Sequence, residues 1–305
     1  MTVQVRRMEE GDLDEADRVM RLAFGTEFRL PDPLSFAGDV DLIRPRWRAD
    51  RTACFVAQAD GEIVGSAIVA FWGSLAVVGP VTVRPDRWNA GVARTLVPAV
   101  LDAADHAGAA VVALYTHPSS PRHLRLYESF GFASRRLIAV MSRPVDPAVA
   151  QPAPFLLGRS APDEAVTACA RLADRTFPGL DLTGPIRATA SQRLGDTVLL
   201  HREGVLAGFA VCHTGPGSEA GSGVLGVNFA VAEPGALEDL VAATEAYAAL
   251  RGASTVELSA NLGRRAAYAT LKDRGYRTQM TGVAMLRPDI GDYDGPDVPI
   301  LEEWR

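Results

Sequence analysis

The sequence predicts an α/β protein of two tandem domains, each with a mixed central β-sheet flanked by helices. Short β-branched strands alternate with amphipathic helices along the whole chain. A proline-rich stretch with little periodicity, SRPVDPAVAQPAPF (142–155), divides the 305 residues nearly in half. The two halves then show the same order of elements, so an internal duplication is the simplest explanation.

Each half opens with a short strand, VQVRRM (3–8) or PFLLGR (154–159), followed by an acidic helix start and an amphipathic helix. A hairpin with a glycine-marked turn comes next, AQADGEIVGSAIVA (57–70) or LHREGVLAGFAVC (200–212). Each half continues with a strand that ends near a proline, a helix, an apolar strand, a second helix and a Gly-aromatic pair. The predicted boundaries are a first domain at 1–143, a linker at 144–156, a second domain at 157–288 and a tail at 289–305.

Composition excludes several classes of protein. The chain is 48% hydrophobic and 22% charged, with a net charge of −6, whereas nucleic-acid and membrane-surface binders are usually basic. No apolar run reaches membrane-spanning length, and the first residues, MTVQVRRMEEGD, lack the apolar core of a signal peptide. Three distant cysteines favour neither a disulfide framework nor a structural zinc site. We therefore expect a soluble, cytoplasmic protein that binds neither nucleic acid nor membranes.

The stretch VTVRPDRWNAGVARTL (81–96) passes from a strand to a helix through small residues. The first amides of a helix have no intrahelical acceptor, and they bind phosphate when no bulky side chain covers them. Neither a Walker loop nor the full dinucleotide fingerprint is present. From Pro85 to Gly108 is 23 residues, but from Pro234 to Gly252 is only 18, so the second half is five residues short at this loop.

Two motifs resemble those of the GNAT-type N-acetyltransferase superfamily. In VRPDRWNAGVARTL (83–96), the Val-x-Pro strand end and Gly91-Val92-Ala93 match the family's phosphate loop, while Trp88 stands where the family has Gln or Arg. In HPSSPRHLRLYESFGF (117–132), residues 126–132 match Leu-Tyr-x-x-x-Gly-Phe. The resemblance implies the α+β type GNAT fold in the first half, and the second half resembles a degenerate copy that lacks the loop.

The resemblance also implies site residues. Tyr127 falls at the family's general-acid position, and a tyrosine with a pKa of about 10 keeps its proton at pH 7 and can donate it to a leaving thiolate. The corresponding residue of the second half is Leu271, which cannot donate a proton. Residues expected to bind acetyl-CoA, the acyl donor, are Val81, Thr82, Val83, Trp88, Asn89, Ala90, Gly91, Val92, Ala93, Arg94, Thr95 and Ser120, with Ser119 as a further candidate. The reaction needs no metal.

Other residues have two interpretations each. Glu27, Asp39 and Asp41 are candidates for a general base or are surface charges, and no base is assigned. His117 and His123 have poor metal-ligand spacing and no third ligand, and His117 lies near the thioester or in a surface turn. Four aromatic residues line the acceptor pocket or pack in the core: Phe24, Phe28, Phe71 and Trp72. Cys54 and Cys212 lie in strand-like runs and are predicted to be small hydrophobic core residues. The acidic tail is a solvated extension, or it docks through Ile300, Leu301 and Trp304.

The expected function is an N-acetyltransferase that moves acetyl from acetyl-CoA to a primary amine by direct attack, with the first domain active. The acceptor would be a small molecule or a peptide. The second domain would be a scaffold that buries one face against the first, closes the acceptor cleft or mediates a homodimer. Two alternatives stay open: a non-catalytic CoA-binding or regulatory tandem protein, and a mycothiol-synthase-like transferase, an enzyme type that works chiefly from its C-terminal half.

Overall fold

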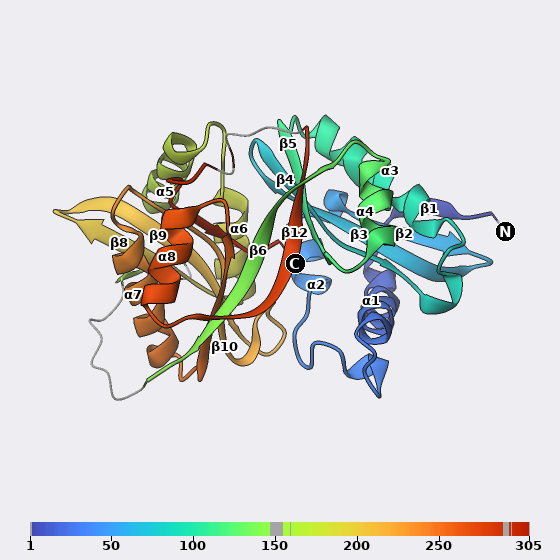
Figure 1. Ribbon diagram of the computed structural model, residues 1–305, viewed down its shortest axis with the longest axis horizontal. Coiled ribbons are helices and arrows are strands. Elements are labelled where there is room, and N and C mark those ends of the chain that lie inside the picture. The colour runs from blue at the N-terminus through green and yellow to red at the C-terminus, as the bar shows by residue number, and fades with distance from the viewer. Residues whose placement is uncertain (1, 147–154, 159, 289–292, 294, 305) are drawn as a thin grey trace.

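The structure, a computed structural model, describes residues 2–146, 155–158, 160–288, 293 and 295–304. It forms two lobes, with the long strands β6 and β12 passing between them (Figure 1). The first half contains β1 (Gln4–Arg7), α1 (Leu13–Glu27), α2 (Arg44–Ala49), β2 (Cys54–Ala59), β3 (Glu62–Trp72), β4 (Leu75–Val83), α3 (Val92–His106), β5 (Val111–Thr116), α4 (Pro121–Glu128) and β6 (Ala133–Pro144). The second contains β7 (Phe155–Leu156), α5 (Asp163–Thr176), α6 (Thr183–Gln192), β8 (Gly195–Arg202), β9 (Val205–Gly215), β10 (Gly221–Ala232), α7 (Leu237–Leu250), β11 (Thr255–Asn261), α8 (Arg265–Asp273), β12 (Arg277–Arg287) and β13 (Ile300–Glu302).

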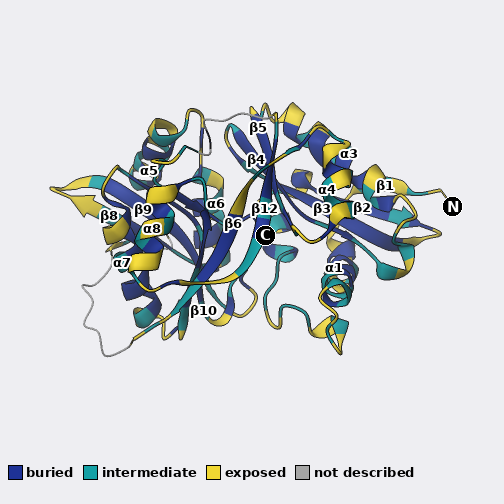
Figure 2. Ribbon diagram, in the orientation of Figure 1, coloured by how far each residue is buried: buried dark blue, intermediate teal, exposed yellow. Residues whose placement is uncertain are grey.

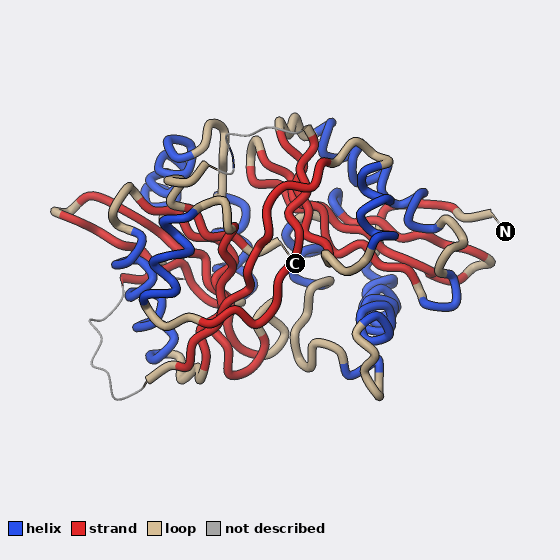
Figure 3. The backbone as a smooth tube through the Cα atoms, in the orientation of Figure 1, coloured by secondary structure: helices blue, strands red, loops and turns tan. Residues whose placement is uncertain are grey.

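The predicted fold class and the repeated order of elements are confirmed, and β1–β6 correspond to β7–β12. The strands join into one 13-stranded sheet in the order β1-β2-β3-β4-β5-β12-β6-β11-β10-β9-β8-β7, with β13 beside β10. Figure 3 shows the strands continuing through both lobes. Two neighbouring pairs are parallel, β4 with β5 and β10 with β11.

The last strand of each half lies in the sheet of the other half. Strand β12 pairs antiparallel with β5, where Met285 lies opposite Leu114, and β6 pairs antiparallel with β11, where Met141 lies opposite Leu258. β6 and β12 also pair with each other at the centre. The segments 1–143 and 157–288 therefore do not each complete a sheet of their own, which the sequence did not predict.

Helices cover both faces of the sheet in each half. On β2, alternate side chains belong to two different cores: Phe55 and Ala57 pack with α3, and Cys54 and Val56 pack with α1. In the second half, α7 and α8 pack on one face, while α5 and α6 pack on the other. The strands are accordingly buried between helices whose outer faces are exposed (Figure 2).

The core around α5 and α6 contains side chains from both halves. The Trp72 and Phe229 rings meet edge to face with centroids 4.9 Å apart. Trp72 thus packs in this shared core, and the interpretation of it as an acceptor-pocket residue is wrong. Phe71 packs against the core beneath α3 instead.

The described part of the tail, residues 293 and 295–304, is not a solvated extension. β13 pairs with β10, and Ile300, Leu301 and Trp304 are all buried. Fully buried Arg264 donates hydrogen bonds to Glu302 Oε1 (2.6 Å) and to the Tyr293 carbonyl (3.1 Å). The docked alternative is therefore the correct one, because this buried ion pair fastens the tail to the second half.

The predicted linker overlaps two strands at its ends, since Pro144 ends β6 and Phe155–Leu156 is β7. Its central part, 147–154, lies outside the described residues. The predicted shortening of the second half appears between the strand and the helix that follows it. Eight residues, 84–91, connect β4 to α3, whereas four, 233–236, connect β10 to α7.

Candidate functional site

Strands β4 and β5 separate part-way along their length. They pair from Leu75–Val78 to Val111–Leu114, and no pairing continues beyond, although β4 runs on to Val83. At the same point β4 bulges, because Val78 pairs with Val69 and Val81 pairs with Ala67, so Gly79 and Pro80 face only Ile68 on β3. The result is an opening between two neighbouring strands.

Backbone groups of β4 face this opening. The Arg84 N–H donates to Val64 O on β3 at 2.8 Å. Because successive N–H groups of a strand point to opposite sides, the N–H groups of Val83 and Val81 point away from β3 and into the opening. Both residues are among those expected to bind the acyl donor, and their main-chain N–H groups can pair with an extended molecule that lies in the opening.

The loop before α3 presents free amides. Among the described residues, the N–H groups of Gly91, Val92 and Ala93 have no hydrogen-bond acceptor, and no side chain caps the helix. Gly91 has a φ of 83°, where a glycine is favoured, and a Cβ there would meet nothing within 4 Å. The partial positive charge of the helix end adds to these donors, so the loop can hold a phosphate.

One open cavity of about 730 Å³ joins the loop to the opening. The predicted donor-site residues that line it are Val81, Thr82, Val83, Trp88, Asn89, Gly91, Val92, Ala93 and Arg94. Three predicted residues are not part of its wall. Ala90 is exposed, Thr95 bonds back to Val92 O at 2.7 Å, and Ser120 is buried just before α4.

Tyr127 lies on α4 and also lines the cavity. Its side chain is buried, its ring packs edge to face on Phe132 at 5.9 Å, and its hydroxyl has no hydrogen-bond partner among the described residues. Burial raises the pKa of Tyr127 to about 12. The hydroxyl is therefore protonated at neutral pH and available as a donor.

His117 and His123 line the cavity near α1. Burial lowers the pKa of both imidazoles, against the opposing charge of Glu27, so both are neutral at pH 7. The His117 ring packs edge to face on Phe28, with centroids 5.1 Å apart, which places it in the site rather than in a surface turn. In the part of the chain that the structure describes, no group of three His, Cys, Asp or Glu side chains could hold a metal ion.

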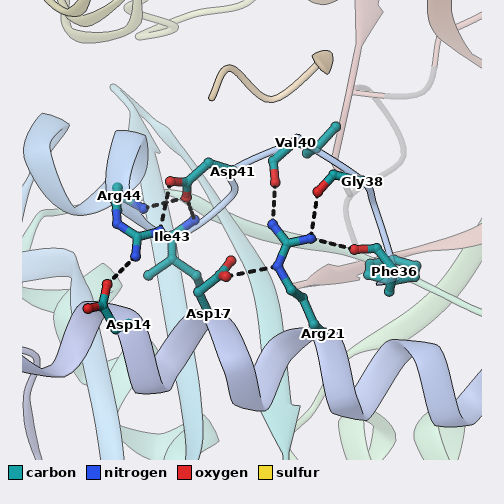
Figure 4. Close-up of polar contacts among 9 residues, drawn as sticks. All are labelled: Asp14, Asp17, Arg21, Phe36, Gly38, Val40, Asp41, Ile43 and Arg44. Atoms are coloured by element: carbon teal, nitrogen blue, oxygen red, sulfur yellow. Dashed lines mark hydrogen bonds and ion pairs between the residues drawn. The ribbon is translucent and has the colours of Figure 1, made fainter. Parts of the chain in front are cut away.

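The segment between α1 and α2 forms another wall, through Phe36, Ala37 and Val40, together with Phe24 from α1 and Phe28 directly after it. Arg21 fixes this segment by donating to the carbonyls of Phe36, Gly38 and Val40 at 2.6–2.9 Å (Figure 4). From the other side, Asp39 accepts hydrogen bonds from the backbone and hydroxyl of Ser222. The segment is thus held between the two halves.

The carboxylates considered as bases have different environments. Asp41 caps α2 by accepting from the N–H groups of Ile43 and Arg44 at 3.0 and 2.9 Å, and it pairs with the Arg44 guanidinium. Neither Asp41 nor Asp39 lines the cavity. Both are structural residues rather than bases or free surface charges. Glu27 does line the cavity and forms an ion pair with Arg122 at 2.5 Å.

The second half supplies part of the cavity wall, in line with the alternative in which it closes the cleft, although the sequence did not identify the residues. Residues of the wall that come from the second half and its tail are Glu219, Ala220, Gly226, Val227, Asn228, Glu257, Met280, Glu303 and Trp304, and Arg46 on α2 faces them. Arg46 donates to Gly79 O at 2.7 Å in the bulge of β4 and forms an ion pair with Glu219 at 2.7 Å. Of these residues, the sequence had marked only Trp304, as a candidate for docking the tail.

The model of the acetyltransferase (GNAT) family matches residues 20–132, which carry the loop, the opening and Tyr127. The first half of the chain is a GNAT domain. This match stops before β6 and includes none of the second half. No curated protein matches the chain in sequence.

Solved structures extend the GNAT likeness to both halves. A Pyrococcus horikoshii protein, provisionally described as an acetyltransferase, has a TM-score of 0.72 at 14% identity, covering 99% of this chain and 95% of its own. A GCN5-related N-acetyltransferase from Sphaerobacter thermophilus has a TM-score of 0.57 at 20% identity, covering 93% and 95%. A tandem GNAT protein from the clavulanic acid biosynthesis pathway has 0.57 at 15%, covering 95% and 100%. At these identities the likeness shows the fold, here the tandem GNAT fold.

Proposed function

We propose that the GNAT domain transfers an acetyl group from acetyl-CoA to a primary amine by direct attack, without a covalent enzyme intermediate. The observation that carries this proposal is a single cavity bordered by the free loop amides, the open edge of β4, the Tyr127 hydroxyl and the second half. The loop amides can bind a phosphate, the strand edge can pair with an extended molecule, and the Tyr127 hydroxyl can donate a proton. Because these groups border one cavity, they fit a long thioester together with a second substrate.

The chemistry follows from the groups present. The amine nitrogen attacks the thioester carbonyl, and the oxygen that becomes negative needs hydrogen-bond donors, which the N–H groups along the open part of β4 would supply. Collapse of the tetrahedral intermediate breaks the C–S bond, and the thiolate takes a proton from Tyr127. Positioning of the two substrates supplies most of the remaining rate enhancement.

The attacking amine must be neutral. An amine with a pKa of about 10.4 is only roughly 0.04% neutral at pH 7, so a proton acceptor is needed. We assign this role to His117, because its imidazole is neutral, lines the cavity and has no hydrogen-bond partner among the described residues. It follows β5 directly, at the side of the opening that faces α1.

We place the acceptor at the end of the cavity that the second half closes. The carboxylates of Glu219, Glu257 and Glu303 line that end together with one arginine, Arg46. Formal charge there is negative, whereas Arg87, Arg94 and Arg122 line the donor end. This polarity suits a phosphorylated donor at one end and an amine at the other, with the second half acting as a cleft-closing scaffold.

We further propose that only the first half is active. The connection from β10 to α7 is too short to form the same loop, and Leu271 is buried where a proton donor would be required. These features oppose a mycothiol-synthase-like reading, which places activity in the C-terminal half. We retain the cytoplasm as the site of action, consistent with three buried, unpaired thiols, Cys54, Cys169 and Cys212.

The test is calorimetric titration of acetyl-CoA into the full chain, followed by an amine screen. One site per chain, lost in Gly91→Glu, is the expected result, because the new side chain brings negative charge and strain to the loop. Absence of binding by the wild-type protein contradicts the proposal. Binding without turnover of any amine class favours the alternative of a non-catalytic CoA-binding protein, for which the departure at Trp88 is the supporting observation.

A further inference from the structure

Trp88 occupies the loop position at which the resembling family carries Gln or Arg, so the loop itself lacks that polar side chain. The indole does not point freely into solvent. Its Nε1 donates to Val83 O on β4 at 2.7 Å, which fixes the orientation of the ring. A flat aromatic face is therefore held at the wall of the cavity, three residues before Gly91.

A cation from another element lies on this face. The Arg122 guanidinium carbon is 4.5 Å from the centroid of the Trp88 ring, at a distance typical of a cation–π contact. Arg122 lies 34 positions beyond Trp88 in the chain and belongs to the first turn of α4. A further positive charge thus lies on the face of the Trp88 ring, in addition to Arg87 in the loop and Arg94 at the start of α3, which also line the cavity.

Arg122 uses little of its hydrogen-bonding capacity. Its Nη2 donates to Glu27 Oε2 at 2.5 Å, while Nε and Nη1 have no acceptor among the described residues. The Arg122 side chain is 38% exposed, and Arg122, Trp88 and Glu27 all line the cavity. A planar guanidinium with free donors, stacked and facing a cavity, is suited to bind a phosphate group.

We infer that Arg122, held on the Trp88 ring, is a phosphate-binding cation of the donor site. It supplies a guanidinium beside position 88, where the loop has an indole, and the free amides of residues 91–93 bind the same diphosphate from the other side. Glu27 holds the guanidinium in place in the absence of a donor. This inference rests on the proposed function, since it concerns how acetyl-CoA is bound.

Arg125 is a matched control on the same helix. It also lines the cavity and carries the same charge, but it has neither an ion pair nor an aromatic ring beneath it in the described part of the chain. A general effect of positive charge on CoA binding would affect Arg125→Ala and Arg122→Ala alike. A specific contact would affect only Arg122.

The experiment titrates CoA and pantetheine, which lacks the phosphates, into the wild-type protein, Arg122→Ala and Arg125→Ala. We expect Arg122→Ala to weaken CoA binding by about tenfold or more and to leave pantetheine binding unchanged, because a charge-assisted bond to phosphate is lost. Arg125→Ala should weaken CoA binding by less than about threefold. Thermal unfolding of each variant is measured alongside, and Arg122→Gln replaces Arg122→Ala if the latter unfolds.

A second variant tests the substitution of one cation by the other. Adding Trp88→Arg to Arg122→Ala places a guanidinium at position 88 of the loop and should recover most of the CoA affinity. Equal loss of CoA and pantetheine binding in Arg122→Ala overturns the inference, as does unchanged CoA binding. Failure of the wild-type protein to bind CoA instead overturns the proposed function, so the two failures are distinguishable.

Discussion

Arg46 of α2 and Glu219, 173 positions apart in the chain, form a two-bond ion pair across the two halves of the protein. Nε donates to Oε1 at 3.1 Å and Nη2 to Oε2 at 2.7 Å, while Nη1 holds the carbonyl of Gly79 in the bulge of β4. Asn228 donates to the same carboxylate at 3.3 Å. One arginine therefore ties the wall supplied by the second half to the opening in the first.

This pair makes stability depend on pH. Burial alone would raise the pKa of Glu219, but the Arg46 charge and the hydrogen bonds outweigh it, and the pKa lies below the ordinary 4.5. A carboxyl with a lowered folded-state pKa stabilises above its unfolded pKa and loses that contribution as pH falls through the folded value. We expect Glu219→Gln to cost about 3 kcal/mol at pH 7, because Arg46 loses its partner, and to flatten the fall of Tm below pH 4.5. Exposed Glu164→Gln is the control, and identical acid profiles of wild type and Glu219→Gln would contradict the prediction.

Tyr127→Phe should separate binding from chemistry. Removal of the hydroxyl leaves the ring contacts intact, so the Kd for CoA should change less than about twofold while kcat falls about 100-fold. Because the pKa of Tyr127 is about 12, deprotonation of its hydroxyl should not reduce the wild-type kcat at pH values below about 11. Tyr247→Phe removes a similarly buried hydroxyl far from the cavity lining and should leave kcat unchanged. An equal fall in both variants would indicate a structural effect.

His117→Gln tests the proposed base. Since burial lowers the pKa of His117 below 6.5, the wild-type kcat/KM should fall only when the pH drops beneath that value. The variant should lose this acid limb and about 100-fold in kcat. His123→Gln, another cavity imidazole with a lowered pKa, should keep the limb. If His117→Gln keeps the fall of kcat/KM at acid pH, the proton acceptor is a group other than His117.

Arg264→Met should release the tail. The substitution leaves Glu302, which is fully buried, without its cation, and breaking such a pair costs about 3–5 kcal/mol. Urea unfolding measures this loss, and limited proteolysis should show faster cleavage near residues 300–304. The double variant Arg264→Met/Glu302→Leu should recover part of the stability, because no charge is then left unpaired. A double variant less stable than the single would contradict this explanation.

Local patterns were sufficient to predict most elements and the loop that connects β4 to α3. Alternation and turn residues identify the hairpins around Gly61 and Gly204, and the difference of five residues marks the half that lacks the loop. These features depend on residues near one another in the chain. Gly91 illustrates this, since the sequence places a glycine between a strand and a helix and the residue there adopts a φ of 83°, which glycine favours.

Contacts between distant segments were not predictable in the same way. The predicted order of elements ended each half at its Gly-aromatic pair and included neither β6 nor β12, and the local pattern of these segments does not specify which half they pair with. The role of Asp41 as a cap, the partnership of Arg46 with Glu219 and the seat of Arg122 on Trp88 each depend on the assembled chain. Trp72 was ambiguous for the same reason, since a tryptophan suits either a core or a pocket.

The exchange of β6 and β12 has a consequence for synthesis on the ribosome. The sheet of the first half ends at β5 until β12, at Arg277–Arg287, has left the ribosome. The GNAT domain must therefore wait, with the edge of β5 uncovered, for almost all of the chain to be translated. Neither half is expected to mature alone, and two separately expressed halves should regain activity only when mixed while still unfolded.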